Sequence, residues 1–390
     1  MWPPLPLIIR DYGKRCADER TAVDNLIAAL EHSDRVREIN LDWYPCPGRG
    51  YVTDSAAMQK PFPELTYLIL AMNEDESRPI LPDSFLGGTA PRLQSLVLQD
   101  VPFPGLPKLI LSATHLVNLE LYCIPCSGYI PPEAMATSFS ALTSLETLRL
   151  FFRCPPPRPA LGSRRPPPLT RSILPNLTYI GFSGTSEYLE EILARIDAPR
   201  LDDLNIAFFN QIIFDTTQLF QFARRTPTLR APERGIITFM PHAIVIKFHG
   251  LSVKILCTTS EWQLSSLEQV CALSLPLVST LEDLYIEEKY SPPPWHDDVE
   301  ITLWLDVLRP FVAVKNLYIS EEFVPRIAPA LEELVGGRTT EVLPTLDNIF
   351  SKTFQQSRPI HEGVEKFIAA RRLTSHPVAV SPRGLGRVLL

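Results

Sequence analysis

Apolar residues recur along this chain in one fixed spacing, apolar-x-x-apolar-x-apolar. One copy is Leu93-Gln-Ser-Leu96-Val-Leu98, and eight further copies begin at residues 36, 65, 116, 145, 177, 201, 281 and 314. Alternate side chains of a strand point to opposite faces. The second and third apolar positions of each copy, such as Leu96 and Leu98, are therefore predicted to point into a core, and their neighbours to point outward.

The copies repeat at short intervals. From residue 36 the first positions fall at 36, 65, 93, 116, 145, 177 and 201, so the steps are 29, 28, 23, 29, 32 and 24. Self-similarity at this period, carried by L-x-x-L-x-L, is typical of leucine-rich repeats. We therefore predict an α/β leucine-rich-repeat solenoid, a horseshoe of irregular repeats about 23–33 residues long with a parallel β-sheet on its concave face.

Other segments have the periodicity of single elements. Residues 5–9 have the pattern of a strand. Two segments joined at His249-Gly250 are predicted to be strands that could form a hairpin, 243–248 and 251–256. Helical spacing of apolar residues predicts helices over 20–32, 187–196, 214–225, 260–275 and 297–308.

The predicted organisation has three parts. Residues 1–320 form an irregular leucine-rich-repeat domain, with a proline-rich loop insertion at 154–168. Residues 321–375 carry three helical patterns, 324–335, 343–354 and 363–373. We expect them to form a helical C-terminal cap, because the open end of a solenoid needs a cover. Residues 376–390 have no helical pattern and are predicted to be a tail.

Composition narrows the class of function. The net charge of −7 argues against nucleic-acid binding, which needs a clustered basic face. No apolar run reaches the roughly 18 residues of a membrane span, and the N-terminus lacks the features of a secretory signal. Seven cysteines without regular spacing indicate reduced thiols and an intracellular location, in the cytoplasm or the nucleus.

Candidate chemistry is sparse. Cys123-Ile-Pro-Cys126 is a lone C-x-x-C without the second pair or the histidines that a zinc site needs, so we interpret it as packing. No motif has the spacing of a nucleophile elbow or a phosphate-binding loop. We therefore expect no catalytic residues, no cofactor and no metal, and we do not expect an enzyme.

The outward positions of the repeat strands remain as the candidate site. Tyrosines among carboxylates and amides suit a protein-binding face, because tyrosine supplies rigid contact area and a polar tip. The alternative is that every repeat solenoid shows mixed polar residues there. The candidate concave-face residues are Tyr67, Glu120, Tyr122, Arg149, Phe151, Tyr179, Asp203, Asn205, Asp283, Tyr285, Glu287, Asn316 and Tyr318.

Several segments resemble one family. They are residues 35–41 after the helix that ends Ala29-Leu-Glu-His32, Trp262-Gln-Leu-Ser-Ser-Leu-Glu-Gln-Val-Cys271, Val314-Lys-Asn-Leu-Tyr-Ile-Ser-Glu-Glu322 and Ala328-Pro-Ala-Leu-Glu-Glu-Leu-Val-Gly-Gly-Arg338. With them the chain, to about Ser381, resembles basidiomycete fungal F-box proteins with leucine-rich repeats. The last residues, 382–390, do not share the likeness.

The resemblance implies a role as substrate receptor. In such proteins an N-terminal F-box docks on the adaptor of a cullin-type (SCF) ubiquitin ligase, and the repeats hold the target protein. The F-box should precede the first strand, and Met1 stands almost on that strand, so we expect the F-box to be absent from this chain. A ligase adaptor is then a partner only if an F-box exists upstream. The alternative is a stand-alone repeat scaffold without a ubiquitin role, and in either case the target is unknown.

Overall fold

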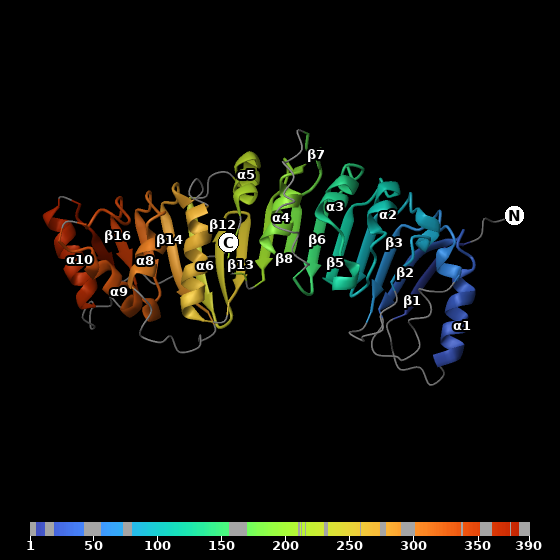
Figure 1. Ribbon diagram of the computed structural model, residues 1–390, viewed down its shortest axis with the longest axis horizontal. Coiled ribbons are helices and arrows are strands. Elements are labelled where there is room, and N and C mark those ends of the chain that lie inside the picture. Colours follow the sequence, from blue (N-terminus) through green and yellow to red (C-terminus); the bar gives the residue numbers. More distant parts are fainter. Residues whose placement is uncertain are drawn as a thin grey trace. The chain divides into compact units, whose positions relative to one another are not determined.

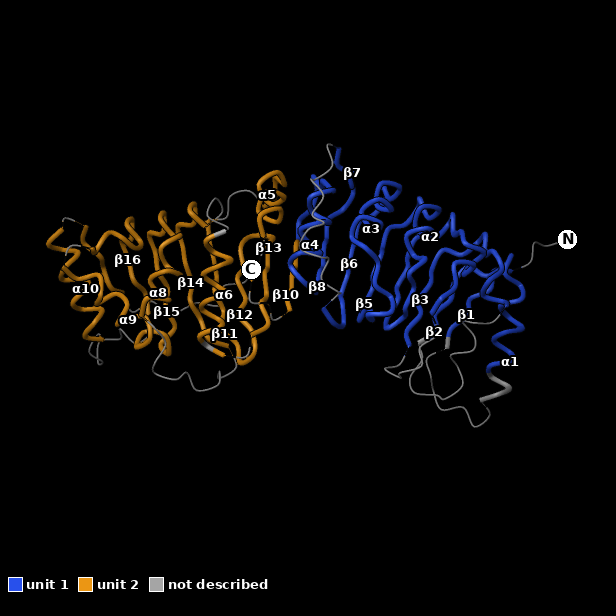
Figure 2. Tube along the Cα trace, in the orientation of Figure 1, with its two compact units in different colours: residues 1–203 blue, residues 204–390 orange. Residues whose placement is uncertain are grey.

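The structure is a computed structural model, and two compact units, residues 1–203 and 204–390, are distinguished in it (Figure 2). Each unit is described by itself. The residues that the structure describes are 5–11, 19–42, 56–72, 80–155, 170–209, 211, 213–214, 216–229, 233–257, 259–273, 278–289, 301–336, 338–351, 361–374 and 376–381.

Unit 1 is built on seven parallel strands that follow one another in chain order (Figure 1). They are β1 (Leu7–Asp11), β2 (Val36–Asp42), β3 (Tyr67–Ala71), β4 (Ser95–Gln99), β5 (Asn118–Ile124), β6 (Thr147–Phe152) and β8 (Tyr179–Gly184). Two short strands, β7 (Ser172–Ile173) and β9 (Ile196–Asp197), pair separately.

The repeat spacing sets both the register and the core of unit 1. Leu96 pairs with Leu119, and Leu98 pairs with Leu121, so equivalent positions of neighbouring copies lie side by side. All four leucines are at most 3 % exposed. The predicted inward positions are therefore confirmed in this unit.

Helices connect the strands of unit 1. They are α1 (Glu19–Leu30), α2 (Leu106–Ser112), α3 (Pro132–Phe139) and α4 (Ser186–Leu193), and short 3₁₀ turns take this place at Ala56–Gln59 and Phe85–Gly88. α2 packs beside α3, and α3 beside α4. Tyr188 of α4 contacts the inward rings of Phe152 and Phe182, with centroids 4.6 and 6.2 Å away, so the buried face of the sheet is the helix side.

Unit 2 departs from chain order. Its strands are β10 (Asp203–Phe208), β11 (Arg234–Met240), β12 (Ala243–Phe248), β13 (Leu251–Leu256), β14 (Asp283–Glu288), β15 (Asn316–Ile319), β16 (Asn348–Phe350) and β17 (Ala379–Ser381). Their spatial order is β10-β13-β12-β11-β14-β15-β16-β17. β12 runs antiparallel to both β11 and β13, so the predicted hairpin over 243–256 is confirmed. The other neighbours are parallel.

The helices of unit 2 are α5 (Thr217–Arg225), α6 (Ser260–Leu273), α8 (Ile301–Leu308), α9 (Val324–Glu333) and α10 (Glu362–Leu373), and 3₁₀ turns lie at Pro227–Leu229 and Glu321–Phe323. Each of α6, α8, α9 and α10 packs beside the next. The inward ring of Phe239 on β11 lies 5.8 Å from Trp304 of α8 and 4.7 Å from Phe323. The helix layer therefore covers the buried face of this sheet too.

The C-terminal part corrects two predictions. The helix expected over 343–354 is wrong, because residues 348–350 form β16, which pairs with β15. The tail expected from 376 is wrong for residues 379–381, which form β17. Both strands extend the sheet, so residues 321–375 are not purely helical, and the boundary expected after residue 320 lies inside unit 2. Residues 382–390 and most of the proline-rich insertion, 156–168, lie outside the described residues.

The cysteines also differ from expectation. The structure joins Cys126 and Cys154 in a disulfide, with Cα atoms 6.5 Å apart. The prediction of reduced thiols is wrong for this pair.

Candidate protein-binding face

The candidate residues lie on the sheet surface away from the helices, which we call the open face. Along β6 the exposed fractions alternate: Leu148 and Leu150 are buried, whereas Thr147, Arg149 and Phe151 are half-buried. The repeat spacing places the candidate residues of both units on this face, where Tyr285 of β14 is itself only 6 % exposed.

In unit 1, five candidate residues from three adjacent strands form one cluster. Arg149 of β6 donates hydrogen bonds from Nη1 to Glu120 Oε2 and to the hydroxyl of Tyr122, at 2.9 and 2.8 Å. The Tyr122 hydroxyl in turn donates to the same carboxylate. The Phe151 ring meets Tyr122 edge to face at 5.3 Å, and the guanidinium lies 4.9 Å from the ring centroid of Tyr179 on β8. We call these five residues the arginine cluster.

A glycine gives the arginine cluster its room. Gly181 pairs with Arg149 in the strand register. A Cβ atom on Gly181 would lie 3.1 Å from ring carbons of both Phe151 and Tyr179. Because this position has no side chain, the two rings can close around it and the guanidinium can reach Tyr179.

The electrostatics of the arginine cluster follow from partial burial. Burial raises the pKa of Tyr122, and its hydrogen bond to Glu120 raises it further, so this phenol stays protonated. The hydrogen bond to Tyr122 raises the pKa of Arg149 above its ordinary value. The cluster therefore presents a fixed cation and a fixed carboxylate that are already paired, with two aromatic rings beside them.

In unit 2, aromatic rings stack along the open face. Tyr285 of β14 and Tyr318 of β15 are parallel within 3°, with centroids 4.1 Å apart. Phe350 of β16 stacks on Tyr318 at 4.6 Å and 15°. The guanidinium of Arg234 on β11 lies 5.4 Å from the Tyr285 centroid. The three rings, which we call the aromatic ladder, occupy one position on three consecutive strands.

A row of amides runs beside the aromatic ladder. Asn348 donates from Nδ2 to Asn316 Oδ1, and Asn316 donates from Nδ2 to Asp283 Oδ1, each at 2.8 Å. The same aspartate is 3.9 Å from the guanidinium of Arg234. These bonds hold the three strands in register at the edge where the rings begin.

The remaining candidate residues are more scattered. Tyr67 is half-buried on β3, two strands before the arginine cluster. Asp203 and Asn205 are exposed on β10, where Asn205 pairs with Ser252 of the hairpin. Glu287 accepts a hydrogen bond from the Thr238 hydroxyl at 2.9 Å. The structure therefore joins ten candidate residues into contacts and leaves Tyr67, Asp203 and Asn205 apart from them.

Sequence reasoning missed several open-face residues. Asn348 and Phe350 belong to Leu346-Asp-Asn-Ile349-Phe-Ser351, a copy of the repeat with serine at its third apolar position. The first two apolar positions could have revealed this copy. Arg234 lies on β11, and Lys247 and Lys254 lie on the hairpin. These strands lack the leucine spacing, and only the strand register places the three residues on this face.

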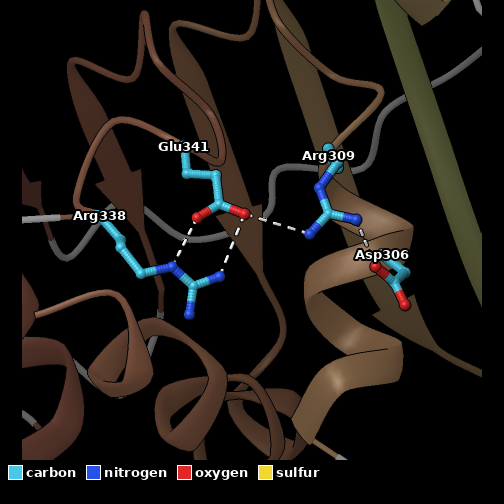
Figure 3. A network of polar contacts seen from close by, with 4 residues as sticks. All are labelled: Asp306, Arg309, Arg338 and Glu341. Atoms are coloured by element: carbon cyan, nitrogen blue, oxygen red, sulfur yellow. Dashed lines mark hydrogen bonds and ion pairs between the residues drawn. The ribbon is translucent and has the colours of Figure 1, made fainter.

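A separate polar network lies away from the candidate residues (Figure 3). Glu341 accepts hydrogen bonds from Arg338 at 2.6 and 3.1 Å and from Arg309 at 3.2 Å, and Arg309 also pairs with Asp306 at 2.5 Å. The hydrogen bond from Arg338 lowers the pKa of Glu341. Every charge has a partner, so this network ties the end of α8 to the loop before β16.

The described part of the chain holds no group of three or more His, Cys, Asp and Glu residues placed to bind a metal ion. Among the same residues, no helix combines the length and apolar character needed to cross a membrane.

Comparisons with known proteins give one structural neighbour. No protein-family profile matches the chain, and no curated protein matches it. The crystal structure of the leucine-rich repeat-containing protein LegL7 from Legionella pneumophila is similar at 12 % identity and a TM-score of 0.31, over 88 % of this chain and 99 % of that one. The assignment of an α/β leucine-rich-repeat-like fold stands on the repeat spacing and on the parallel strands described above.

Proposed function

We propose that this protein is a binding module that holds another protein on the open face of its repeat strands. The proposed function contains no catalytic step and needs no cofactor. The observation that carries it is the content of the open face. In both units an aromatic ring there contacts a guanidinium group, Tyr179 in unit 1 and Tyr285 in unit 2, although the core needs no rings at outward positions.

The chemistry of these groups fits protein recognition. Tyrosine and arginine are enriched among the residues that contribute most binding energy at protein interfaces. Their cost on binding is small when neighbours already hold the side chain in place, because little rotamer freedom remains to be lost. The arginine cluster and the aromatic ladder are both held in this way, by hydrogen bonds and by stacking.

The finer proposal follows from the family resemblance. We propose that the chain is the substrate-recognition region of an F-box protein, so that the captured protein is a target for ubiquitination inside the cell. The alternative is a scaffold of the same fold that holds its partner without a ubiquitin ligase. The two share the open face and differ only in what is attached to it.

Affinity capture from fungal cells tests the binding face. We expect the wild type to retain a partner protein. At least one of two double variants should lose it: Arg149→Ala with Tyr179→Ala in unit 1, or Tyr285→Ala with Tyr318→Ala in unit 2. Lys108→Ala is the matched control, because this exposed lysine is on helix α2 and not on the open face. A partner held equally by all four proteins contradicts the proposed function.

The ubiquitin part needs its own measurement. A version of the chain extended upstream, to include any F-box encoded there, should bring down a cullin and its adaptor when the shorter chain does not. If neither version recovers them while the partner is still captured, the scaffold alternative is correct.

A further inference from the structure

The hairpin of unit 2 places two lysines, Lys247 and Lys254, on the open face. Lys247 of β12 is exposed and Lys254 of β13 is half-buried. Among the described residues, no carboxylate forms an ion pair with either lysine, whereas Lys315 and Lys366 pair with glutamates at 2.8 and 2.6 Å. Two cations side by side repel each other, so an unpaired pair of this kind costs free energy that an anionic partner can recover.

The strand register places these lysines in line with the aromatic ladder. Lys247 pairs with Ile236, Ile236 pairs with Tyr285, and Tyr285 pairs with Tyr318. Residues that pair directly across a sheet point to the same face. The row therefore runs from a cation, over an apolar residue that is 7 % exposed, to stacked rings.

The second lysine is a diagonal neighbour of the first. Lys247 pairs with Ser252, and Lys254 pairs with Val245, two residues further along β12. Diagonal positions of this kind lie about 7–8 Å apart. On an extended peptide, side chains two residues apart point the same way and are separated by about 6.6–6.8 Å. Two carboxylates at such spacing can reach both lysines at once.

We propose that the open face of unit 2 binds an extended acidic segment of the partner protein, with two carboxylates on Lys247 and Lys254 and an aromatic or large apolar residue at the aromatic ladder. This inference rests on the proposed function and specifies its partner. From Lys247 to Tyr318 there are three strand steps, about 14 Å at the usual strand spacing. An extended chain covers that distance in about four residues, which sets the separation between the acidic pair and the apolar residue.

The charges beside the aromatic ladder restrict the apolar end of the peptide. Asp283 and Glu287 flank Tyr285 on the same strand. Asp283 lies beside Arg234, and Glu287 accepts a hydrogen bond from the Thr238 hydroxyl. Neither carboxylate forms an ion pair with a hairpin lysine. A carboxylate of the peptide is therefore attracted to the hairpin end of the row and repelled from the ladder end, which fixes the direction in which the peptide lies.

Selection from a library of random twelve-residue peptides displayed on phage tests the inference with the full chain immobilised. Peptides that bind the wild type should carry two acidic residues at alternate positions, with an aromatic or large apolar residue about four positions away. The double variant Lys247→Glu with Lys254→Glu should lose the acidic preference. Tyr318→Ala should lose the aromatic preference and keep the acidic one. Lys108→Glu, which reverses the charge of one exposed lysine on helix α2, should select as the wild type does.

One selected peptide with a fluorescent label then gives the magnitude. We expect the lysine double variant to bind it at least tenfold more weakly in fluorescence anisotropy. Raising the salt concentration should weaken wild-type binding more than that of the variant, because exposed ion pairs are screened. Both lysines lie outside the core, so the urea midpoint of the lysine double variant should equal that of the wild type.

Three outcomes overturn the inference: selected peptides without an acidic preference, an unchanged preference in the lysine double variant, or binding only by phosphorylated members of a parallel synthetic library. Its failure is distinguishable from failure of the proposed function. If the captured partner still depends on the Tyr285→Ala and Tyr318→Ala pair or on the Arg149→Ala and Tyr179→Ala pair, the face binds protein in another way. If it depends on neither pair, the face is not the binding site.

Discussion

The open faces of the two units use the same repeat frame in different ways. In unit 1 a single guanidinium gathers a carboxylate, a phenol and two rings from three strands, and its charges are balanced within the arginine cluster. In unit 2 three rings stack from one strand to the next, and amides bond in a row beside them. The hairpin adds two lysines that have no ion-pair partner among the described residues. The leucine spacing determines the inward residues in both units. It does not determine the outward residues, which form the arginine cluster in one unit and the aromatic ladder in the other.

The largest expected effect tests what the units share. Leu148 on β6 and Leu284 on β14 occupy the same inward position and are at most 1 % exposed. We expect Leu148→Ala and Leu284→Ala each to lower the free energy of unfolding by about 2–5 kcal/mol, measured by urea denaturation, because each leaves a cavity. A loss well below 1 kcal/mol in either unit shows that its inward row is not a packed core.

The next effect isolates the aromatic ladder. Tyr318→Ala removes two stacking contacts and should lower the free energy of unfolding by about 1–3 kcal/mol. Tyr67→Ala is the matched control, since this half-buried tyrosine on β3 has no ring neighbour among the described residues. Equal losses for the two substitutions contradict a stabilising role for stacking.

Salt separates the arginine cluster from the aromatic ladder. Arg149→Ala should cost about 1 kcal/mol at low salt, because it removes an ion pair, a hydrogen bond and a cation–ring contact that are only partly buried. In 1 M sodium chloride, where the Debye length is about 3 Å, this loss should shrink, whereas the loss for Tyr318→Ala should persist. Parallel urea titrations at the two salt concentrations measure the contrast.

The smallest expected effect is on a titration. Burial, with Tyr318 as the next cause, raises the pKa of Tyr285 to about 12 from its ordinary value of 10.0. Because the folded state holds this proton more tightly than the unfolded state, the contribution to stability is complete below pH 10 and is lost as the pH rises toward 12. Tyr318→Phe keeps the stacked ring and removes the hydroxyl, so the pKa of Tyr285 should fall by a fraction of a unit.

Tyrosinate absorbance measures that shift. The titration of Tyr285 is the difference between each protein and its Tyr285→Phe counterpart. A rise in the pKa of Tyr285 in the Tyr318→Phe variant contradicts this prediction, because loss of the neighbouring phenol should lower it. No change shows that burial alone sets the value.

The inward face could be predicted from the sequence because it depends only on the spacing of apolar residues within each strand. The spacing within each copy decides which side chains are buried, and the copies pair in chain order through unit 1. β16 escaped prediction because Ser351 fills its third apolar position and because Leu343, Leu346 and Phe350 also fit a helical period. The pattern there supports two structures, and pairing with β15 decides between them.

The contacts of the open face could be predicted only in part. The outward position of Arg149 follows from its own strand, but its reach to Tyr179 depends on the glycine at position 181 of the next repeat. Lys247 and Lys254 lie on two antiparallel strands that do not carry the leucine spacing, so the repeat pattern does not predict which residues they pair with. Such contacts depend on which residues pair between strands, and the spacing within a strand does not contain that information.

The inserted hairpin has a consequence for how the chain folds. Unit 1 pairs each main strand with the next one in the sequence, so its sheet can grow from any copy by short loop closures. In unit 2, β10 pairs with β13 and β11 with β14, and each pairing encloses intervening strands of the same sheet. Contacts that close long segments slow folding, since the entropy of closure is lost before the contact forms. We therefore expect unit 2 to refold more slowly than unit 1.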